Sequence, residues 1–174
     1  MKTIQIFIFS TFLIMSNVVF AQEIELKGTN NTYIQKEMQG IYGVWNKSNK
    51  LDDIIPSYLC FEHIPTIGIK NKSKLDAIID VYLSPFFKRY GANLKSTSIL
   101  YFYFYADING IIKEMYMSYP KEIGIIPITS IEKLESEILN SEVRLIFDKN
   151  NRIFNGSIWI GRGVGYDPND LRKN

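Results

Sequence analysis

The sequence predicts an α+β protein, in which an antiparallel sheet carries a helix packed on one of its faces. Five consecutive aromatic residues at 101–105 and a second strand-like run at 111–119 flank an Asn-Gly pair, the strongest short-range signal for a β-hairpin. An amphipathic stretch follows at 129–140, and a helix laid on a sheet buries the apolar faces of both. Because 46% of the residues are hydrophobic, one domain can build a sizeable core, and we place it at residues 22–165.

The N-terminus has the anatomy of a secretory signal peptide. Lys2 gives a positive start, an apolar run covers residues 4–15, and small residues occupy the −3 and −1 positions before a cleavage site at Ala21–Gln22. The alternative is a retained anchor, since the run reaches the lower limit of a membrane-spanning helix. Removal of residues 1–21 predicts a periplasmic or secreted protein with no membrane span in its mature chain.

Charge and cysteine content narrow the classes of function. The chain carries 20 basic and 18 acidic residues, so it offers no basic footprint for nucleic acid. Cys60 is the only cysteine, and no intramolecular disulfide can form in an oxidising compartment. Stability must therefore come from the core.

The first half of the domain gives mixed signals. Clusters of Asn, Ser, Gly and charge predict loops at 28–31 and 46–53. Between them, residues 32–45 fit either a short amphipathic helix or a strand, and the pattern leaves both open. Residues 57–64 favour a strand that ends at a proline.

A helix is predicted from Ser73, as its N-cap, to the neighbourhood of Ser84. Apolar residues recur there at helical spacing. Pro85 should end or kink this helix, because proline lacks the amide N–H and disfavours helical geometry in the residue before it. Gly91 is a plausible C-terminal stop after it.

The hairpin has two possible registers. A two-residue turn at 109–110 places Phe104 opposite Met115, whereas a type I turn at 107–110 with a glycine bulge places Phe104 opposite Glu114. We favour the first, because it separates Phe, Leu and Met from Tyr, Glu and Ser. That register assigns alternate residues of the first strand to the core, namely Leu100, Phe102 and Phe104. It assigns four tyrosines to the other face: Tyr101, Tyr103, Tyr105 and Tyr116.

The remaining elements complete the domain. Thr129 and Glu132 have the spacing of a capping box at the start of the helix 129–140. Strands are predicted at 142–147 and 152–160. Residues 161–174 are rich in Gly, Pro and charge, and we expect a loose segment that ends in a flexible tail at 166–174.

The order strand, strand, helix, strand in residues 98–160 resembles the C-terminal domain of TonB. The turn residues Asp107 and Gly110 and the helix-core residue Leu134 match that pattern by position. The whole precursor also resembles small secreted Bacteroides-type proteins of unknown function. The resemblance implies a ββαβ topology. It does not imply energy transduction, because the sequence shows no Pro-rich spacer and its anchor is predicted to be cleaved.

The residues that could carry chemistry do not form a catalytic, metal-binding or phosphate-binding motif. Cys60 and His63 lie on a predicted strand, where the spacing i, i+3 puts side chains on opposite faces. A zinc site needs more ligands than this chain's one histidine and one cysteine supply. The acidic pair 52–53 lacks the ladder of a calcium loop, and the glycines of 161–165 lack the Lys-Ser/Thr of a phosphate loop. We therefore predict no metal and no cofactor.

These observations favour a non-enzymatic binding or interaction module of the cell envelope. Its candidate binding face comprises the four tyrosines, because tyrosine is amphipathic and common at recognition surfaces. The partner is expected to be an envelope protein or a glycan. The alternatives are an envelope hydrolase that uses Cys60 and His63 or carboxylates, and a secreted inhibitor or immunity-like protein.

Overall fold

The computed structural model describes residues 23–51, 66–90, 99–151, 154 and 157–173. Its strands are β1 (Glu23–Lys27), β2 (Thr32–Met38), β3 (Ile41–Asn46), β4 (Gly68–Lys70), β5 (Leu100–Ala106), β6 (Ile112–Pro120), β7 (Arg144–Ile146) and β8 (Ile160–Tyr166). Its helices are α2 (Lys72–Tyr90), the short 3-10 helix η5 (Lys121–Ile123), α3 (Ile128–Asn140) and α4 (Pro168–Lys173).

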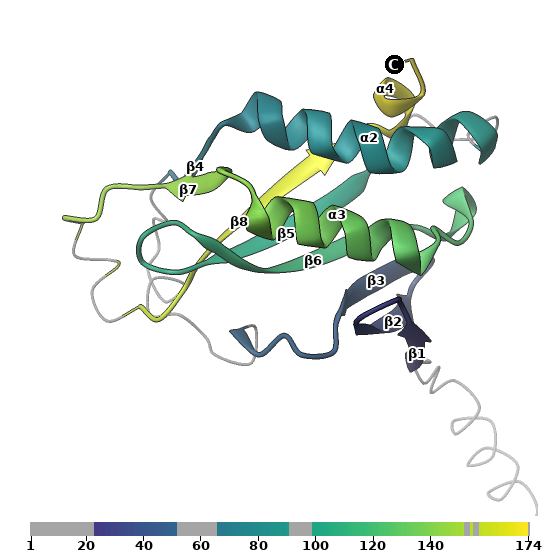
Figure 1. The fold of residues 1–174 in the computed structure, drawn as a ribbon, viewed down its shortest axis with the longest axis horizontal. Helices are drawn as coiled ribbons and strands as arrows, with labels where there is room; N and C mark the ends of the chain where they lie inside the picture. The colour runs from purple at the N-terminus through teal and green to yellow at the C-terminus, as the bar shows by residue number, and fades with distance from the viewer. Residues whose placement is uncertain (1–22, 52–65, 91–98, 152–153, 155–156, 174) are drawn as a thin grey trace, which may run out of the picture.

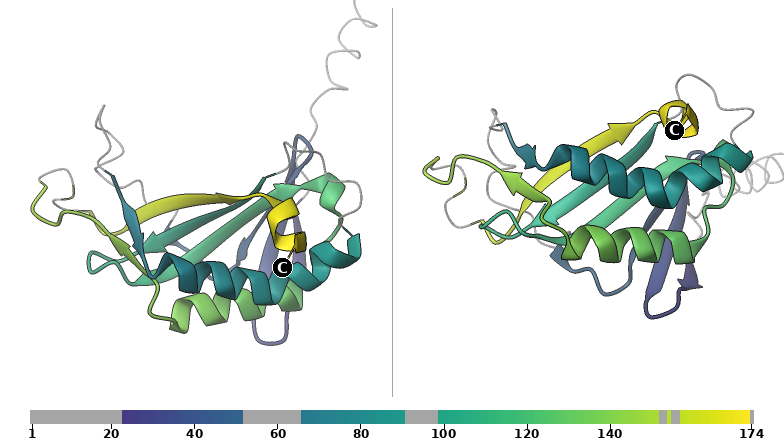
Figure 2. Two further views of the ribbon diagram at one scale, coloured as in Figure 1. Left: turned by 90° about the horizontal axis from the view of Figure 1, so that it is seen from above. Right: turned by 45° about the horizontal axis from the view of Figure 1, so that its top comes forward.

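Six strands form one sheet in the order β1-β2-β3-β6-β5-β8, and every neighbouring pair is antiparallel. β4 and β7 pair separately. Helices α2 and α3 lie side by side on one face of the sheet, and α4 lies beside α2 (Figure 1; Figure 2). The predicted α+β class is confirmed. No helix in the described part of the chain is long and apolar enough to cross a membrane.

Residues 32–45, for which the sequence left helix and strand open, form the hairpin β2–β3. Met38 pairs with Ile41, so the loop has two residues. Gln39 and Gly40 both have positive φ, 49° and 82°, which is the geometry of the two-residue turns that match strand twist. Glycine adopts this conformation without strain.

The β5–β6 hairpin combines the two predicted registers. The Gly110 amide donates to the Asp107 carbonyl at 2.8 Å, and Gly110 has φ 79°, so the turn is the type I turn with a glycine bulge. A second irregularity in β6, opposite Tyr105 and Ala106, then shifts the pairing by one residue. Phe104 therefore pairs with Met115 as favoured, although the turn is the one that we did not favour.

Helix α2 does not end at Pro85 but continues to Tyr90. Phe86 and Phe87 follow the proline, and both are buried in the core. Burying each phenylalanine gains about 1.5–3 kcal/mol, which offsets a cost of about 3 kcal/mol for proline inside a helix. The predicted N-cap is also wrong, because the helix begins at Lys72, before Ser73.

The amphipathic helix 129–140 is confirmed as α3, and its predicted apolar stripe is buried at Ile131, Leu134 and Ile138. The predicted capping box is absent. The helix begins at Ile128 after Pro127, without a side-chain cap. Glu132 lies beyond the first turn and has a different partner, described below.

The C-terminal segment differs most from the prediction. The predicted strand 142–147 exists as β7 but pairs with β4 and lies outside the six-stranded sheet. Most of the predicted strand 152–160 is not strand in its described residues. Residues 160–166 instead form β8, and the expected flexible tail contains α4, whose Leu171 is buried in the core.

Candidate functional site

The tyrosines of β5 lie on the sheet face opposite α2 and α3. Leu100, Phe102 and Phe104 are fully buried on the helix-covered face, as the sequence predicted. Tyr101 is 39% exposed on the other face. Tyr103 pairs with Tyr116 of β6 and both are half-buried. We call Tyr101, Tyr103, Tyr105 and Tyr116 the tyrosine face.

Three of these tyrosines extend over glycines of the neighbouring strands. The hydroxyl end of Tyr101 occupies the space where a Cβ on Gly163 of β8 would stand, and Tyr103 does the same at Gly161. Tyr116 leans the other way, onto Gly43 of β3. An aromatic ring that covers a glycine in this manner protects backbone and replaces the missing side-chain contacts. The rings can take these positions because the glycines have no side chains there.

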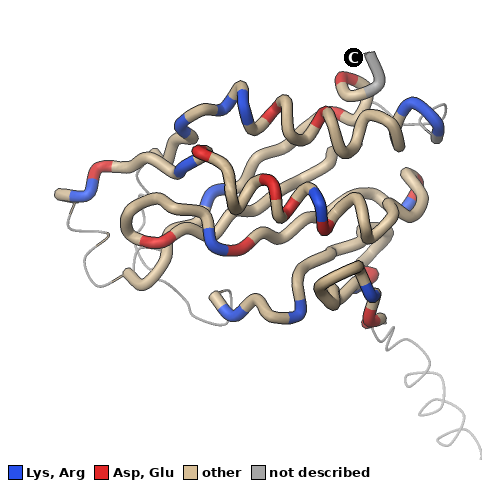
Figure 3. The backbone as a smooth tube through the Cα atoms, in the orientation of Figure 1, with Lys and Arg blue, Asp and Glu red and all other residues tan. Residues whose placement is uncertain are grey.

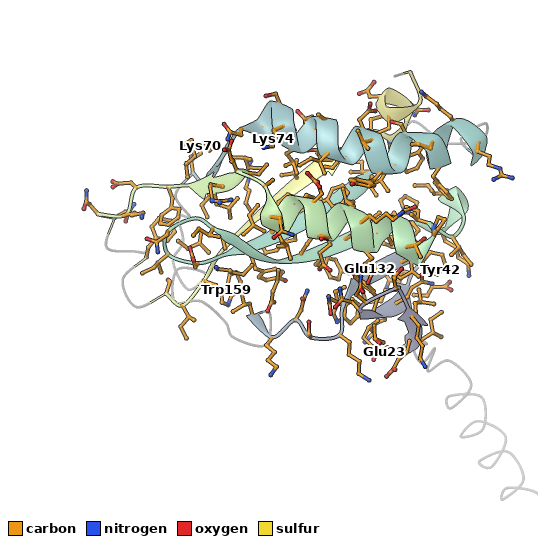
Figure 4. All side chains as sticks on the ribbon, in the orientation of Figure 1. Glu23, Tyr42, Lys70, Lys74, Glu132 and Trp159 are labelled. Atoms are coloured by element: carbon orange, nitrogen blue, oxygen red, sulfur yellow. The ribbon has the colours of Figure 1, made fainter. Side chains whose placement is uncertain are left out.

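Aromatic contacts continue across this face. Tyr116 stacks on Trp45 of β3, with ring centroids 5.7 Å apart and an interplanar angle of 29°. Tyr105 makes edge contacts at 4.9 Å with both Tyr103 and Trp159. Trp159 is buried and Tyr105 is only 9% exposed (Figure 4 labels Trp159). Of the four predicted tyrosines, Tyr105 is thus buried, and it packs against Tyr103 and Trp159.

Sequence reasoning missed the glycines and Trp45 as parts of this face. It assigned Gly161, Gly163 and Gly165 to a loose segment because of their number. Their spacing of two residues was the available signal. It equals the period of a strand and matches the alternate tyrosines of 101–105.

Several residues considered for chemistry lie outside the described residues, namely Asp52, Asp53, Cys60 and His63. Within the described ranges, no group of three or more His, Cys, Asp or Glu residues is placed to hold a metal ion. The glycines of 161–165 lie in an extended strand.

Glu132 joins α3 to the loop before β2 (Figure 4). Its carboxylate accepts hydrogen bonds from the backbone amides of Thr29, Asn30 and Asn31 at 2.6, 2.8 and 2.7 Å. Burial acts to raise its pKa, but the three amides outweigh this and hold the pKa below its usual value. The Glu132 carboxyl is therefore ionised when it accepts these hydrogen bonds.

Glu135, one turn later on α3, is buried against β2 and β3. It accepts hydrogen bonds from the Tyr33 hydroxyl at 2.6 Å and from the Asn46 amide at 3.1 Å. Burial raises the pKa of this carboxyl above its usual value, against the opposing effect of the two hydrogen bonds. Glu132 thus ties α3 to the loop before β2, and Glu135 ties it to β2 and β3, which gives both glutamates a structural role.

A third polar cluster lies where α2 meets the end of β8. The Tyr166 hydroxyl donates to the Asp76 carboxylate at 2.7 Å, and Lys72 is ion-paired with Asp76. The Lys72 ammonium also lies 4.6 Å from the centre of the Tyr166 ring. Burial, followed by the adjacent Asp76, raises the pKa of the Tyr166 phenol, so this hydroxyl stays a proton donor.

No family model matches the sequence, and no curated protein matches it. The fold is similar to the crystal structure of a DUF5043 family protein from Bacteroides uniformis, with a TM-score of 0.60 and 14% identity over 88% of this chain and 89% of that chain. This likeness shows a shared fold. It agrees with the predicted resemblance to Bacteroides-type proteins of unknown function, whereas the resemblance to TonB stays a prediction.

Proposed function

We propose that this protein is a binding module of the cell envelope and that its tyrosine face binds a glycan. One observation carries the proposal: the hydroxyl ends of tyrosines of β5 and β6 lie over glycines of the neighbouring strands, with Tyr101 partly exposed. An aromatic ring presents an apolar face with a negative potential. The C–H groups on one side of a sugar ring carry partial positive charge and can stack on that face.

The placement of these rings over glycines favours a glycan over a protein as the ligand. Protein interfaces are dominated by a few protruding anchors that fill pockets in the partner. Here the hydroxyl ends of three rings lie over glycines of β3 and β8. On the same face of β6, Glu114 already accepts hydrogen bonds from the backbone amides of Lys50 and Leu51, whereas Ser118 supplies a hydroxyl beside the rings. Hydroxyl groups of a sugar need hydrogen-bonding partners of this kind.

Affinity electrophoresis tests the proposal. Migration of the purified protein through gels that contain soluble bacterial or host polysaccharides should be retarded by at least one of them. Tyr101→Ala should lose the retardation, while Tyr82→Ala on α2 should keep it. The absence of retardation by every polysaccharide, or an equal loss in both variants, would refute glycan binding at this face.

The envelope location rests on residues 1–21 as a cleaved signal peptide. The expected mass of the exported protein is that of a chain beginning at Gln22. A chain that retains Met1 and fractionates with the cytoplasm would contradict this part of the proposal.

The alternative functions would use other residues or another kind of partner. A hydrolase that uses Cys60 and His63 depends on residues outside the described part, and the buried carboxylates of α3 are engaged as structural ties. A secreted inhibitor, or a TonB-like domain that contacts another envelope protein, would bind a protein partner. Affinity capture from the envelope fraction would then recover a protein and no glycan.

A further inference from the structure

A small hollow lies where strands β1, β2 and β3 meet the segment that precedes α3. Its lining residues are Ile24, Gln35, Glu37, Tyr42 and Ile125, of which Figure 4 labels Tyr42. Its volume of about 200 Å³ is several times the roughly 30 Å³ that one water occupies in the liquid. Pockets for drug-sized ligands are larger, about 300–1,000 Å³. The hollow therefore suits a single side chain or a small ring.

Gln35 is the residue of this hollow that points to a ligand. It is only 4% exposed, and within the described part of the chain its side-chain oxygen Oε1 is buried without a hydrogen-bond partner. Buried polar atoms in proteins are nearly always hydrogen-bonded, because an unpaired acceptor loses its hydration and gains nothing in return. An unpaired acceptor beside a hollow indicates that a ligand supplies the missing donor.

The residues on either side of Gln35 on the same face of β2 already have partners. Side chains alternate along a strand, so Tyr33, Gln35 and Glu37 share one face. The Tyr33 hydroxyl donates to Glu135 of α3, which identifies this face as the helix-covered one. The Glu37 carboxylate accepts a hydrogen bond from the Lys121 ammonium at 2.6 Å. Of this row of three, Gln35 is the member whose hydrogen-bonding capacity is not met within the described residues.

The charges around the hollow favour an uncharged occupant. Lys121 neutralises Glu37 and also lies 5.9 Å from the centre of the Tyr42 ring. Figure 3 shows both acidic and basic positions at this end of the sheet, so neither sign of charge dominates. Ile24 and Ile125 add exposed apolar side chains to the walls. The occupant that fits is uncharged, largely apolar and equipped with one hydrogen-bond donor.

A tryptophan side chain has this combination of properties. Its indole N–H is a donor, and the ring carries no acceptor. A tyrosine hydroxyl would bring an acceptor as well, although Gln35 Oε1 and the Glu37 carboxylate are themselves acceptors. The indole ring can also pack edgewise or offset against Tyr42. Tryptophan is enriched among the side chains that fill pockets at protein interfaces.

We propose that this hollow binds the indole side chain of a tryptophan on a partner protein. The ring packs against Ile24, Ile125 and Tyr42, and its N–H donates to Gln35 Oε1. The last torsion of a glutamine side chain is broad, so the amide can turn its oxygen toward the ring nitrogen. This site rests on observations independent of the tyrosine face.

The probe is N-acetyl-tryptophanamide, and its 1-methyl analogue is the matched probe, which has the same ring without the N–H. Shifts of the backbone amide resonances of Gln35, Tyr42 and Ile125 in NMR spectra measure binding at millimolar probe. The first probe should bind about fivefold more tightly than the second, which is the effect of one hydrogen bond of ordinary strength. N-acetyl-lysinamide should not shift these resonances, because Lys121 already pairs with Glu37.

Gln35→Met removes the acceptor and keeps the length of the side chain. This variant should bind the two probes equally, and it should unfold at no lower temperature than the wild type, because an apolar group replaces an unpaired polar one. Ile125→Ser should weaken the binding of both probes. Val81→Ser on α2 is its matched control and should bind like the wild type, since Val81 is 65% exposed and Ile125 is 66% exposed.

Three results would overturn the proposal. The first is that N-acetyl-tryptophanamide binds no more tightly than its 1-methyl analogue. The second is that folded Gln35→Met keeps the wild-type preference for the probe with the N–H. The third is that free indole binds more tightly than N-acetyl-tryptophanamide, which would identify the occupant as a small molecule and not as a side chain of a partner protein.

Discussion

The two faces of the sheet are built from the same strand and differ in what they pack against. On β5, Phe102 and Phe104 are fully buried in the core with α2 and α3, while the alternate residues Tyr101 and Tyr103 extend over glycines of β8. One face is held by shape-filling apolar contacts that include two helices. The other is held by rings resting on backbone. An aromatic run can therefore serve core and surface at once when its alternate residues have different neighbours.

The largest effect should come from removing a ring on the helix-covered face. Phe102→Ala should destabilise the protein by about 3–5 kcal/mol, because it leaves a cavity in a fully buried site. Tyr101→Ala, one residue away, should cost less than about 1 kcal/mol, since its neighbours are an open surface and a glycine. Urea unfolding monitored by circular dichroism gives both values. Similar losses for the two would contradict the assignment of the faces.

The next effect concerns the tie between α3 and the first hairpin. Glu132→Ala removes the acceptor of three backbone amides and should cost about 2–3 kcal/mol. Glu137→Ala, on the exposed side of the same helix, serves as the control and should change little. Hydrogen exchange at Asn30 should accelerate in the first variant alone. Unchanged exchange there would show that the loop does not depend on Glu132.

The two glutamates of α3 predict opposite pH dependences. The folded state lowers the pKa of Glu132, so its stabilisation is present above its ordinary value of 4.5 and is lost as pH falls below it. The folded state raises the pKa of Glu135, so stability declines as pH rises from 4.5 through the folded value. The free energy of unfolding should be measured across this pH range. In Glu132→Gln it should no longer fall as the pH drops below 4.5, and in Glu135→Gln it should no longer decline as the pH rises above 4.5. Curves parallel to that of the wild type would contradict these assignments.

The smallest stability effect should come from the glycines beneath the tyrosines. Gly163→Ala would push against the Tyr101 hydroxyl, which can swing outward because the side chain is partly exposed, so the expected loss is about 1 kcal/mol. Gly165→Ala faces only Ile99 and should cost less. The order is checked by thermal unfolding, and a reversed order would mean that Tyr101 does not rest on Gly163.

Local patterns allowed the hairpin and α3 to be predicted, because turn chemistry and apolar spacing act within a few residues. The prediction failed where distant contacts decided the structure. Glu132 has cap spacing from Thr129, yet its partners lie about 100 residues away in the chain. Gly161–Gly165 form a strand only because β5 pairs with them and supplies rings to cover them. Pro85 stays in a helix because the two phenylalanines after it reach the core.

The most direct test of the central claim compares Gly163→Ala with Gly165→Ala in affinity gels that retard the wild-type protein. Both variants keep every tyrosine, but only the first displaces Tyr101 from its position on β8. We predict that Gly163→Ala loses most of the retardation and that Gly165→Ala migrates like the wild type. Equal retardation of the two folded variants would show that the placement of the tyrosines on glycine does not form the binding surface.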